Sequence, residues 1–436
     1  MPERMGLVLR SGPGAAVTTE MGIEVGRALA AEHKRVAVIS DDMRSTRMMK
    51  EALISGILSQ GADVLDCGSA TEAAAAYAAR LADCSAYVSE CPTYGNASGY
   101  RLFGRDGRQF TESQIRRLDS IRDNLVTPNH MGLGKRIPYV NAVSDYNSFA
   151  SSRIGKISGA PVLLDCGCGI ASESAPQVLE SVGIEVISVN CHRSRDFVPK
   201  DPSAEAQQFG WLHDLISNKE GCIGIGMDRI GSRATVIGED GNIIDHASAS
   251  ALAVRSAAPK SIVMSMNVTS RVKDEFLKNG GDPEMIYMAP MGTADVAAVM
   301  AEKNADMAVC DAGIMYSGIP ALDGIRTAAA ISKLANSGSL KKMAEDVSTL
   351  RDISSIKVDN NPGAFDRGME TALSGREGKI FVCKDGWRVD MDKGWVLIRK
   401  PKEGVCRVSA ESPDSAYLAG LLETGADMVR IASKSQ

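Results

Sequence analysis

The sequence predicts an α/β protein with three related α/β domains, whose sheets are mixed and mostly parallel, followed by a C-terminal α+β domain. Short apolar, β-branched runs alternate with helical patterns, and this alternation starts afresh three times, as is typical of sheets covered by helices. Roughly the last eighty residues instead show consecutive strand patterns joined by tight-turn pairs. At 436 residues the chain is also too long for a single hydrophobic core. We therefore expect several domains.

The composition is that of an ordinary globular protein, with 44% hydrophobic and 24% charged residues. The formal net charge is only −5, so electrostatics gives no reason to expect a nucleic acid or a membrane surface as partner. No apolar run is long enough to span a bilayer. Ten cysteines lie far apart, except for Cys166 and Cys168, and the N-terminal residues contain no signal-peptide core. We expect a cytoplasmic protein with reduced, mostly buried thiols, and no zinc site because no CxxC pair occurs.

The repeated units can be followed along the chain. The first begins with an apolar strand at Arg35–Ser40 and continues with a helical pattern from Arg47 to Gln60. A further strand is expected at Ser85–Cys91, before the turn-rich letters PTYGNASG. The second unit begins at Pro161–Gly169, where a strand enters a glycine-containing turn, and the third at Lys260–Arg271. Each unit has about a hundred residues, the usual size of a domain.

The C-terminal part differs from the three units. The letters KIFVCKDGWRVDMDKGWVLIRKPKEGVCRVSAE contain Asp-Gly and Lys-Gly turns between strand patterns, which indicates antiparallel hairpins. A helix is expected from Ser412 to about Thr424. These patterns divide the chain into expected domains of residues 1–148, 149–250, 251–352 and 353–436.

Four segments carry a family resemblance when they are taken together and in order. They read ALISGILSQGADVLDCG, GYRLFGRDGRQF, VLLDCGCGIASESAPQVLESVGIEVISVNC and DGWRVDMDKGWVLIRKP. In these segments the chain resembles the α-D-phosphohexomutase superfamily of phosphoglucomutase, phosphomannomutase and phosphoglucosamine mutase. The resemblance implies four domains around a central cleft, with one active-site loop from each. It also implies a reaction that moves a phosphoryl group between two hydroxyls of a sugar phosphate, through a phosphoserine and a bound metal ion.

The first of these loops carries the nucleophile in the family, where it reads Thr-Ala-Ser-His-Asn-Pro. By this resemblance Cys91 takes the place of the serine, Pro92 that of the histidine, and Arg101 that of a nearby lysine. A thiolate is a strong nucleophile and could accept the phosphoryl group. Proline cannot carry a proton, and an arginine does not exchange one near neutral pH. Two readings stay open for Cys91: a catalytic nucleophile, or a small residue at a disused site.

The second loop holds the metal in the family, through the three carboxylates of Asp-Gly-Asp-Ala-Asp-Arg. The matching residues 224–229 read GIGMDR, so that only Asp228 and Arg229 remain. Magnesium prefers several oxygen ligands in near-octahedral geometry, and one carboxylate makes a weak site. A bound Mg²⁺ is therefore possible but doubtful. The alternative role of Asp228 and Arg229 is a structural ion pair.

The third loop reads out sugar hydroxyls in the family, through a glutamate in a Gly-Glu-x-Ser-Gly or Gly-Glu-x-Asn-Gly motif. The corresponding residues 309–318 read VCDAGIMYSG, and the glutamate is not in register. Asp311 or Ser317 could still meet a ligand in the cleft, whereas the Met-Tyr pair between them is more typical of packing. The sugar specificity of the family does not carry over.

The fourth loop binds the non-reacting phosphate in the family, and here its serine and threonine are replaced. Four cations remain within nine residues: Arg399, Lys400, Lys402 and Arg407. Arginine and lysine bind phosphate well, so these residues are expected phosphate ligands, with a solvated hairpin tip as the alternative. Ser11 is added to this group because it matches the serine of the family's N-terminal Gly-Thr-Ser-Gly-Ile-Arg-Gly motif, which here lacks the arginine.

These patterns leave three hypotheses for the function. The first is a protein that binds a phosphorylated sugar, or a related phosphorylated small molecule, after losing the serine- and magnesium-dependent chemistry. The second is an active phosphosugar mutase, an intramolecular phosphotransferase of the isomerase class, with Cys91 as nucleophile. The third is a subunit that pairs with an active relative. A homo-oligomer is compatible with each of the first two.

Overall fold

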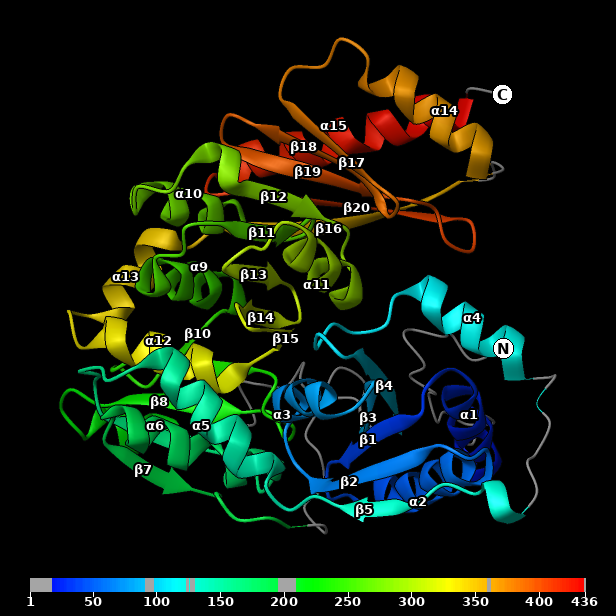
Figure 1. The fold of residues 1–436 in the computed structure, drawn as a ribbon. Coiled ribbons are helices and arrows are strands. Elements are labelled where there is room, and N and C mark those ends of the chain that lie inside the picture. Colours follow the sequence, from blue (N-terminus) through cyan, green and yellow to red (C-terminus); the bar gives the residue numbers. More distant parts are fainter. Residues whose placement is uncertain are drawn as a thin grey trace.

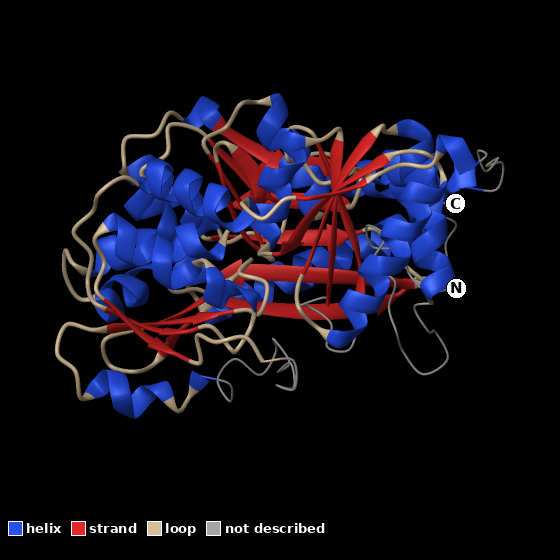
Figure 2. Ribbon diagram, turned by 60° about the horizontal axis from the view of Figure 1, so that its bottom comes forward, coloured by secondary structure: helices blue, strands red, loops and turns tan. Residues whose placement is uncertain are grey.

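The computed structural model describes residues 18–90, 98–122, 125, 130–194, 209–358 and 362–434. Four five-stranded sheets follow one another along this described part of the chain. In Figure 1 the first sheet lies at the lower right, the second at the lower left, the third above the second, and the fourth at the top. Figure 2 shows helices packed beside the strands. The predicted fold class, three related α/β units followed by a different C-terminal part, is confirmed.

The first sheet has the strand order β4-β3-β1-β2-β5, and only β4 runs antiparallel to its neighbour. Gly26 and Gly56 let the first two helices approach closely, because a Cβ at either position would lie within 2.3 Å of a backbone oxygen of the other helix. The elements of this unit are α1 (Thr19–Glu32), β1 (Arg35–Ser40), α2 (Arg44–Ser59), β2 (Asp63–Ser69), α3 (Glu72–Ala78), η1 (Ala79–Leu81), β3 (Cys84–Glu90), β4 (Ser98–Gly104), α4 (Glu112–Arg122), η2 (His130–Gly132) and β5 (Arg136–Pro138).

The second and third sheets repeat one topology, with the orders β10-β9-β8-β6-β7 and β12-β11-β13-β14-β15. In each, the first strand pairs in parallel with the next two, and the third strand opens an antiparallel hairpin. The second contains α5 (Ala142–Ile154), β6 (Val162–Asp165), η3 (Ile170–Glu173), α6 (Ala175–Val182), β7 (Val186–Val189), α8 (Leu212–Ser217), β8 (Ile223–Met227), β9 (Ala234–Ile237) and β10 (Ile243–Ile244). The third contains α9 (His246–Ala257), β11 (Ile262–Ser265), α10 (Ser270–Lys278), η5 (Pro283–Met285), β12 (Ile286–Ala289), α11 (Thr293–Glu302), β13 (Met307–Cys310), β14 (Gly313–Tyr316), β15 (Ile319–Leu322), α12 (Gly324–Ala335) and α13 (Leu340–Val347).

The fourth sheet is antiparallel throughout, in the order β16-β20-β19-β18-β17, so the predicted hairpins are confirmed. The last helix begins at Ser415 and continues to Lys434, ten residues beyond the expected end at Thr424, because its buried stripe of Gly425, Met428, Val429 and Ala432 keeps packing on the sheet. The elements are β16 (Leu350–Lys357), α14 (Pro362–Leu373), β17 (Lys379–Cys383), β18 (Gly386–Met391), β19 (Gly394–Arg399), β20 (Val405–Ser412) and α15 (Ser415–Lys434).

The first three units share one buried apolar cluster, which reaches from Ala37 in β1 to Val347 in α13. The first unit also has a second cluster of its own, which reaches from Ala28 to Leu118. One link in the shared cluster is α3, whose run of buried alanines lets it pack against β3 within its own unit and against β15 and α5 outside it. The expected boundaries after residues 148, 250 and 352 fall inside α5, α9 and β16. The division into four domains stays a prediction.

Candidate functional site

A cavity of about 260 Å³ lies at the carboxyl ends of β11 and β13, beside the N-terminus of α9 and the start of β16. The strands β11 and β13 are adjacent and parallel, and this edge of an α/β sheet is a common place for ligands to bind. The polar part of the lining comes from four separate segments. It includes Asp245, His246, Ser250, Asn267, Thr269, Asp311 and Arg351.

The loop from β11 to α10, which supplies Asn267 and Thr269, is held by the fourth sheet. Arg388 is 1% exposed, and its Nη1 donates to two carbonyl oxygens of the loop, at 2.9 and 2.7 Å. Glu411 is fully buried and accepts hydrogen bonds from Thr269 Oγ1 and Ser270 N, both at 2.9 Å. A loop with this many bonds to buried charged groups has little freedom to move. The cavity therefore has a firm wall on this side.

His246 is the first residue of α9, and its imidazole is neutral at pH 7. Burial and the nearby Arg233 guanidinium lower the pKa of His246 to about 4. The Cys310 carbonyl accepts a hydrogen bond from the ring, while the buried Nε2 has no partner among the described residues. Nε2 is therefore the ring nitrogen without a partner among the described residues. A neutral imidazole can accept a hydrogen bond at this nitrogen, and burial disfavours the charged form of the ring.

Ser250 lies one turn further along α9 and lines the same cavity. Its Oγ is also buried without a hydrogen-bond partner in the described part of the chain. Residues four apart on a helix lie on the same face, so the side chains of His246 and Ser250 lie on one face of α9. Leaving a buried polar group unpaired costs about 1–3 kcal/mol, and a native structure accepts that cost mainly where a ligand or a water satisfies the group. The pair marks the cavity as a binding site for polar groups.

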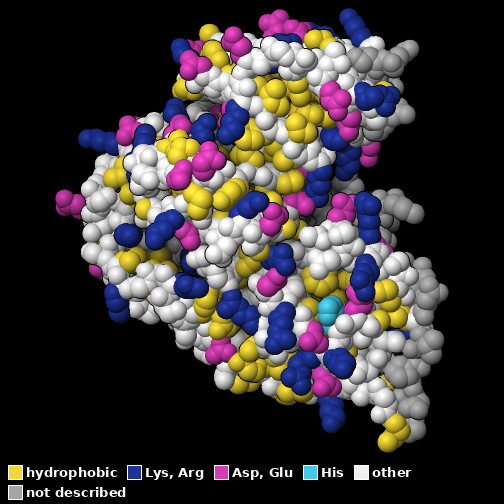
Figure 3. All heavy atoms as spheres, turned by 45° about the horizontal axis from the view of Figure 1, so that its top comes forward, with side chains coloured by type: hydrophobic (Ala, Val, Ile, Leu, Met, Phe, Trp, Pro, Cys, Tyr) yellow, Lys and Arg dark blue, Asp and Glu magenta, His cyan; other side chains and the backbone are white. Residues whose placement is uncertain are grey.

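Three arginines of the fourth sheet gather at the side of the cavity where Asp311 lies. Arg351 bonds Glu411 at 2.9 Å and is 3.9 Å from the Asp311 carboxylate. Arg399 has Asp311, Arg351 and Arg407 among its charged neighbours, and burial lowers its pKa. Its Nε is buried and has no partner among the described residues. Figure 3 shows a hollow between the upper and the lower right parts of the molecule, with Lys and Arg side chains on its border.

The other two expected phosphate ligands of this loop lie apart from that group. Lys400 forms an ion pair with Asp366 of α14, and its Nζ lies 5.3 Å from the centre of the Trp387 ring. Lys402 is exposed at the tip of the β19–β20 hairpin, where its backbone exchanges two hydrogen bonds with Val405. The structure therefore brings Arg399 and Arg407 together but not Lys400 and Lys402. A phosphate-binding role stays a prediction for all four.

Asp311 and Ser317, the two expected residues of the third loop, lie at opposite ends of the β13–β14 hairpin. Asp311 follows β13 at the cavity, and Arg233 Nη2 donates to its backbone oxygen at 2.6 Å. Ser317 follows β14, and its backbone N–H donates to Asp306, which precedes β13. Four residues of strand separate the two ends, which is about 13 Å. Only Asp311 borders the cavity described here.

Asp228 lies at the end of β8, and both of its carboxylate oxygens are already bonded within its own turn. Oδ1 accepts from Ser232 N at 2.7 Å and Oδ2 from Ser232 Oγ. Burial raises the pKa of the Asp228 carboxyl, which disfavours its charged form. Arg229 points elsewhere, with Nη2 3.1 Å from the Ser194 carbonyl and 2.9 Å from Met43 Sδ. These bonds give Asp228 a structural role in the β8–β9 turn.

The described residues around Asp228 do not fit a magnesium site. Gly224 and Gly226 stand where the family has its other two carboxylates, and apolar side chains fill the space beside them. A Cβ at position 226 would lie 2.5 Å from the Phe209 ring, and one at position 224 would lie 2.4 Å from Ile216. Among the described residues no group of three or more His, Cys, Asp or Glu is placed to hold a metal ion. Magnesium requires oxygen ligands, and the neighbours of positions 224 and 226 are hydrocarbon.

Two expected site residues, Cys91 and Ser11, lie outside the described residues. Arg101 lies on β4 and forms a largely buried ion pair with Glu72, the first residue of α3. The backbone N–H of Glu72 donates to Ile230, so α3 also contacts the turn that follows Asp228. Arg101 is thus held at the contact of the first and second units.

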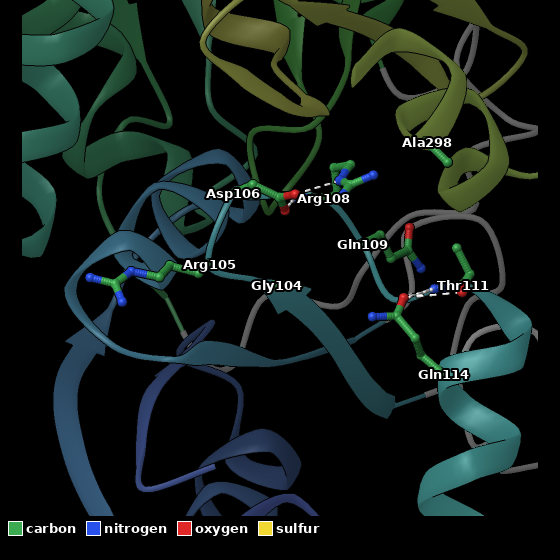
Figure 4. Close-up of a pocket in the computed structure, with 8 residues that line it drawn as sticks. All are labelled: Gly104, Arg105, Asp106, Arg108, Gln109, Thr111, Gln114 and Ala298. Carbon is green, nitrogen blue, oxygen red and sulfur yellow. Dashed lines mark hydrogen bonds and ion pairs between the residues drawn. The ribbon is translucent and has the colours of Figure 1, made fainter. Parts of the chain in front are cut away.

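A larger cavity, of about 600 Å³, lies between the segment after β4 and helix α11 (Figure 4). In the close-up Arg108 is bonded to Asp106, and Thr111 to Gln114, so these polar side chains satisfy one another. Ala298 of α11 closes the opposite side. No lining residue of this cavity is among the described groups that are buried without a partner. The smaller cavity is therefore the stronger candidate, despite its size.

Sequence reasoning missed His246, Ser250 and Arg351. A single histidine after an Asp at a helix start, a serine in an alanine-rich helix, and an arginine in an edge strand carry no motif. The one available signal was the placement of His246 directly after the strand of residues 243–244, where a helix N-terminus faces the edge of a sheet.

Comparison with known proteins gives the relationship. Residues 12–126 match the family model "Phosphoglucomutase/phosphomannomutase, alpha/beta/alpha domain I", and residues 138–241 match that of domain II, together just over half of the chain. A protein of Methanococcoides burtonii named "Probable phosphoglucosamine mutase" is 30% identical over 92% of this chain and 93% of its own. A phosphopentomutase of Thermococcus kodakarensis is 27% identical over 91% of each chain.

Solved structures agree on the fold. A phosphoglucomutase/phosphomannomutase family protein from Burkholderia thailandensis superposes with a TM-score of 0.82 at 19% identity, covering 100% of this chain and 99% of the other. Parafusin, a phosphoglucomutase from Paramecium, gives 0.72 at 14% identity over 99% and 95%. The family models and the 30% identical relative, each independent of the cavity, establish that the chain belongs to the α-D-phosphohexomutase superfamily.

Proposed function

We propose that this protein binds a phosphorylated sugar, or a related phosphorylated small molecule, between its third and fourth sheets, without the serine- and magnesium-dependent chemistry of its family. Arg399 and Arg407 would hold the phosphate, and the cavity of His246 and Ser250 would hold the uncharged polar part. Three buried polar atoms without a partner among the described residues carry the proposal. His246 Nε2 and Ser250 Oγ belong to residues that line the cavity, and the third, Arg399 Nε, belongs to a residue that has Asp311 of the lining among its charged neighbours.

The charges support a division of the ligand into two parts. Guanidinium groups bind phosphate through paired, charge-assisted hydrogen bonds, and a half-buried one loses little to water. The cavity itself has a histidine whose charged form burial disfavours, a serine and the Asp311 carboxylate, which suit hydroxyl groups. A ligand with phosphate at one end and hydroxyls at the other matches this arrangement. The relatives named as mutases of phosphorylated sugars support the same class of ligand.

The loss of the family's chemistry is supported by the surroundings of Asp228. Phosphoryl transfer depends on neutralising the charge of the transferring group, which the family does with a metal. Here Phe209 and Ile216 fill the space beside Gly226 and Gly224, and Ser232 uses both oxygens of Asp228. We derive no catalytic step through a metal at this place.

The test is calorimetric titration of the full chain with glucosamine 6-phosphate, glucose 1-phosphate and inorganic phosphate, in EDTA and then in Mg²⁺. At least one sugar phosphate should bind more tightly than inorganic phosphate, with the same affinity in both buffers. Arg399→Gln should weaken the sugar phosphate and inorganic phosphate alike, by about tenfold or more. His246→Gln should weaken the sugar phosphate only. Arg430→Gln, an exposed arginine of α15, is the matched control. No binding by folded protein, or unchanged binding by Arg399→Gln, would refute the proposal.

A second candidate function is an active phosphosugar mutase with Cys91 as nucleophile. It is favoured by the full-length similarity to a relative named "Probable phosphoglucosamine mutase". A coupled mutase assay with hexose and hexosamine phosphates, Mg²⁺ and a bisphosphate activator decides between the two. Turnover that Cys91→Ser retains and Cys91→Ala abolishes would establish the second candidate. That the protein is cytoplasmic and forms a homo-oligomer remains a prediction. No helix in the described ranges is both long and apolar enough to cross a membrane.

A further inference from the structure

Two thiols of the second sheet lie against each other. Cys166 directly follows β6, and Cys191 comes two residues after β7, its parallel neighbour, so the two loops leave the sheet side by side. The Sγ atoms are 2.9 Å apart. A disulfide bond measures about 2.05 Å, and two unbonded sulfur atoms prefer a wider separation than the one here. The pair therefore needs a movement of less than about 1 Å to become bonded.

The two thiols differ in access. Cys166 is fully buried, whereas Cys191 is partly exposed at the surface of the loop. The hydrogen bond between them lowers the pKa of the Cys191 thiol, and together with burial it raises that of Cys166. An accessible thiol that ionises more readily, beside a buried thiol that does not, is the arrangement found in cysteines that react with peroxides.

We propose that Cys166 and Cys191 are a site of reversible oxidation, at which a hydroperoxide converts the two thiols into a disulfide. The Cys191 thiolate attacks the outer oxygen of hydrogen peroxide, the O–O bond breaks, and hydroxide leaves, which gives a sulfenic acid. The Cys166 sulfur then attacks the Cys191 sulfur, the S–O bond breaks, and the Cys166 proton leaves with the hydroxyl as water. Two thiols and one peroxide thus give one disulfide and two waters.

Most other described cysteines are poor competitors for this reaction. Burial raises the pKa of Cys67 to about 12, of Cys310 to about 11 and of Cys406 to about 12, which keeps these thiols protonated. Cys168 is the nearest rival, because it is buried two residues from Cys166 and its Sγ is 3.7 Å from His192 Nε2. The experiment below shows whether Cys191 forms its bond with Cys166 or with Cys168.

The disulfide would fasten the turn between β6 and η3, which contacts the turn between β8 and β9. Beyond Cys166 the chain passes through Gly167 and Cys168, both with positive φ, and Ile170 N then donates to the Arg229 carbonyl at 2.8 Å. A cross-link at the start of this turn removes freedom from a segment that contacts Arg229 directly. Oxidation would therefore stabilise the second sheet against unfolding.

The experiment is peptide mapping of the full-length protein by mass spectrometry under non-reducing conditions, before and after hydrogen peroxide. After cleavage at glutamate, which separates Cys166 from Cys191 at Glu173, we expect one cross-linked peptide pair that disappears on treatment with dithiothreitol. Fragmentation of this pair distinguishes a bond of Cys191 to Cys166 from one to Cys168. Cys166→Ser should instead accumulate sulfenic acid at Cys191, trapped by dimedone, and Cys191→Ser should give neither product. Cys310→Ser is the control and should cross-link like the wild type.

The wild-type map alone is decisive if a variant fails to fold. Free Cys166 and Cys191 after peroxide has oxidised other residues would overturn the proposal, and so would a cross-link of Cys191 to Cys168 instead. Cleavage after Glu90 and Glu112 places Cys91 on a peptide without another cysteine, so it is scored separately. A second readout is the thermal midpoint, which should rise on oxidation in the wild type and in Cys310→Ser, and stay unchanged in Cys191→Ser.

Discussion

The ring of Phe209 occupies the space that a side chain on Gly226 would need. A Cβ at position 226 would lie 2.5 Å from Cζ and 2.6 Å from Cε1 of the ring. Phe209 is 3% exposed and belongs to an apolar cluster with Leu212, Ile216 and Ile237. The ring cannot withdraw without opening this cluster to water. The absence of a side chain at 226 and the presence of the phenyl ring are thus two parts of one packing arrangement.

Gly226→Asp should destabilise the protein by about 2–4 kcal/mol, because it overpacks the cluster and buries a carboxylate there. Urea unfolding measures this free energy. Phe209→Ala in the same chain should recover part of the loss, since it makes room for the carboxylate. Gly420→Asp, on the exposed face of α15 where no atom lies within 4 Å, is the control and should change stability by less than about 1 kcal/mol. Equal effects of the two substitutions would contradict this packing explanation.

Magnesium should leave the thermal midpoint of the wild-type protein unchanged. A ligand that binds the folded state raises stability by mass action, by roughly 2.7 kcal/mol at a hundredfold excess over its Kd. Of the three carboxylates that hold the metal in the family, Asp228 is the one that remains here, and Ser232 already bonds both of its oxygens. Differential scanning calorimetry in EDTA and in millimolar MgCl₂ makes the comparison, with CaCl₂ as an ionic control. A rise specific to Mg²⁺ would show that a metal site exists.

His246 should make the protein sensitive to acid below neutral pH. Its pKa is lowered to about 4 in the folded state, against an ordinary value of about 6.5 when unfolded. The stability it contributes is therefore fully present above pH 6.5 and is lost as the pH falls toward 4. Between pH 7 and pH 5 the loss should be roughly 1–2 kcal/mol. Urea unfolding at both pH values should show this loss in the wild type and a smaller one in His246→Gln.

His33 is the comparison for this pH experiment, since burial lowers its pKa as well. His33→Gln should therefore remove a separate part of the acid sensitivity and leave the part due to His246. If wild type and His246→Gln lose the same free energy between pH 7 and pH 5, the imidazole is not held neutral as described.

Glu411→Ala should be among the most destabilising single substitutions in the protein. The carboxylate is fully buried and accepts from Thr269, Ser270 and Arg351, all of which would be left without it. Removing one partner of a buried charged network costs about 3–5 kcal/mol. The exposed Asp427–Arg430 pair of α15 offers a control, because Asp427→Ala should cost less than about 1 kcal/mol. Chemical denaturation of both variants measures the difference.

The sequence predicted those elements whose pattern is local. The strand at Arg35–Ser40 has the predicted bounds because all but its first residue are buried, and the C-terminal hairpins follow from turn pairs that few other structures tolerate. The end of the last helix was placed too early because Gly425 resembles a stop signal. In the structure its missing side chain instead lets Val396 and Val408 pack against the helix.

The candidate site was harder to predict, because it depends on distances between segments far apart in the chain. Arg399 and Lys400 are adjacent in the sequence and were therefore predicted to act together. Neighbouring side chains of an extended chain point to opposite faces, and Lys400 forms an ion pair with Asp366. Asp311 and Ser317 were predicted to belong to one loop, but they lie at opposite ends of the β13–β14 hairpin. His246 and Arg351, about a hundred residues apart, meet only through the fold. Family resemblance supplied the fold, but not the residues that line the cavity.

Arg388 and Glu411 form hydrogen bonds with the loop after β11, so the third and fourth sheets should not be stable as separate fragments. The loop after β11 in the third sheet is held by hydrogen bonds to side chains of the fourth sheet. If the chain is divided between the two sheets, each fragment therefore exposes polar and apolar groups that are buried in the whole protein. A chain ended near residue 350 should expose Met266 and the start of α10, and should be insoluble by itself. The two fragments, produced separately and mixed, should recover a soluble pair, since each holds half of the same hydrogen bonds.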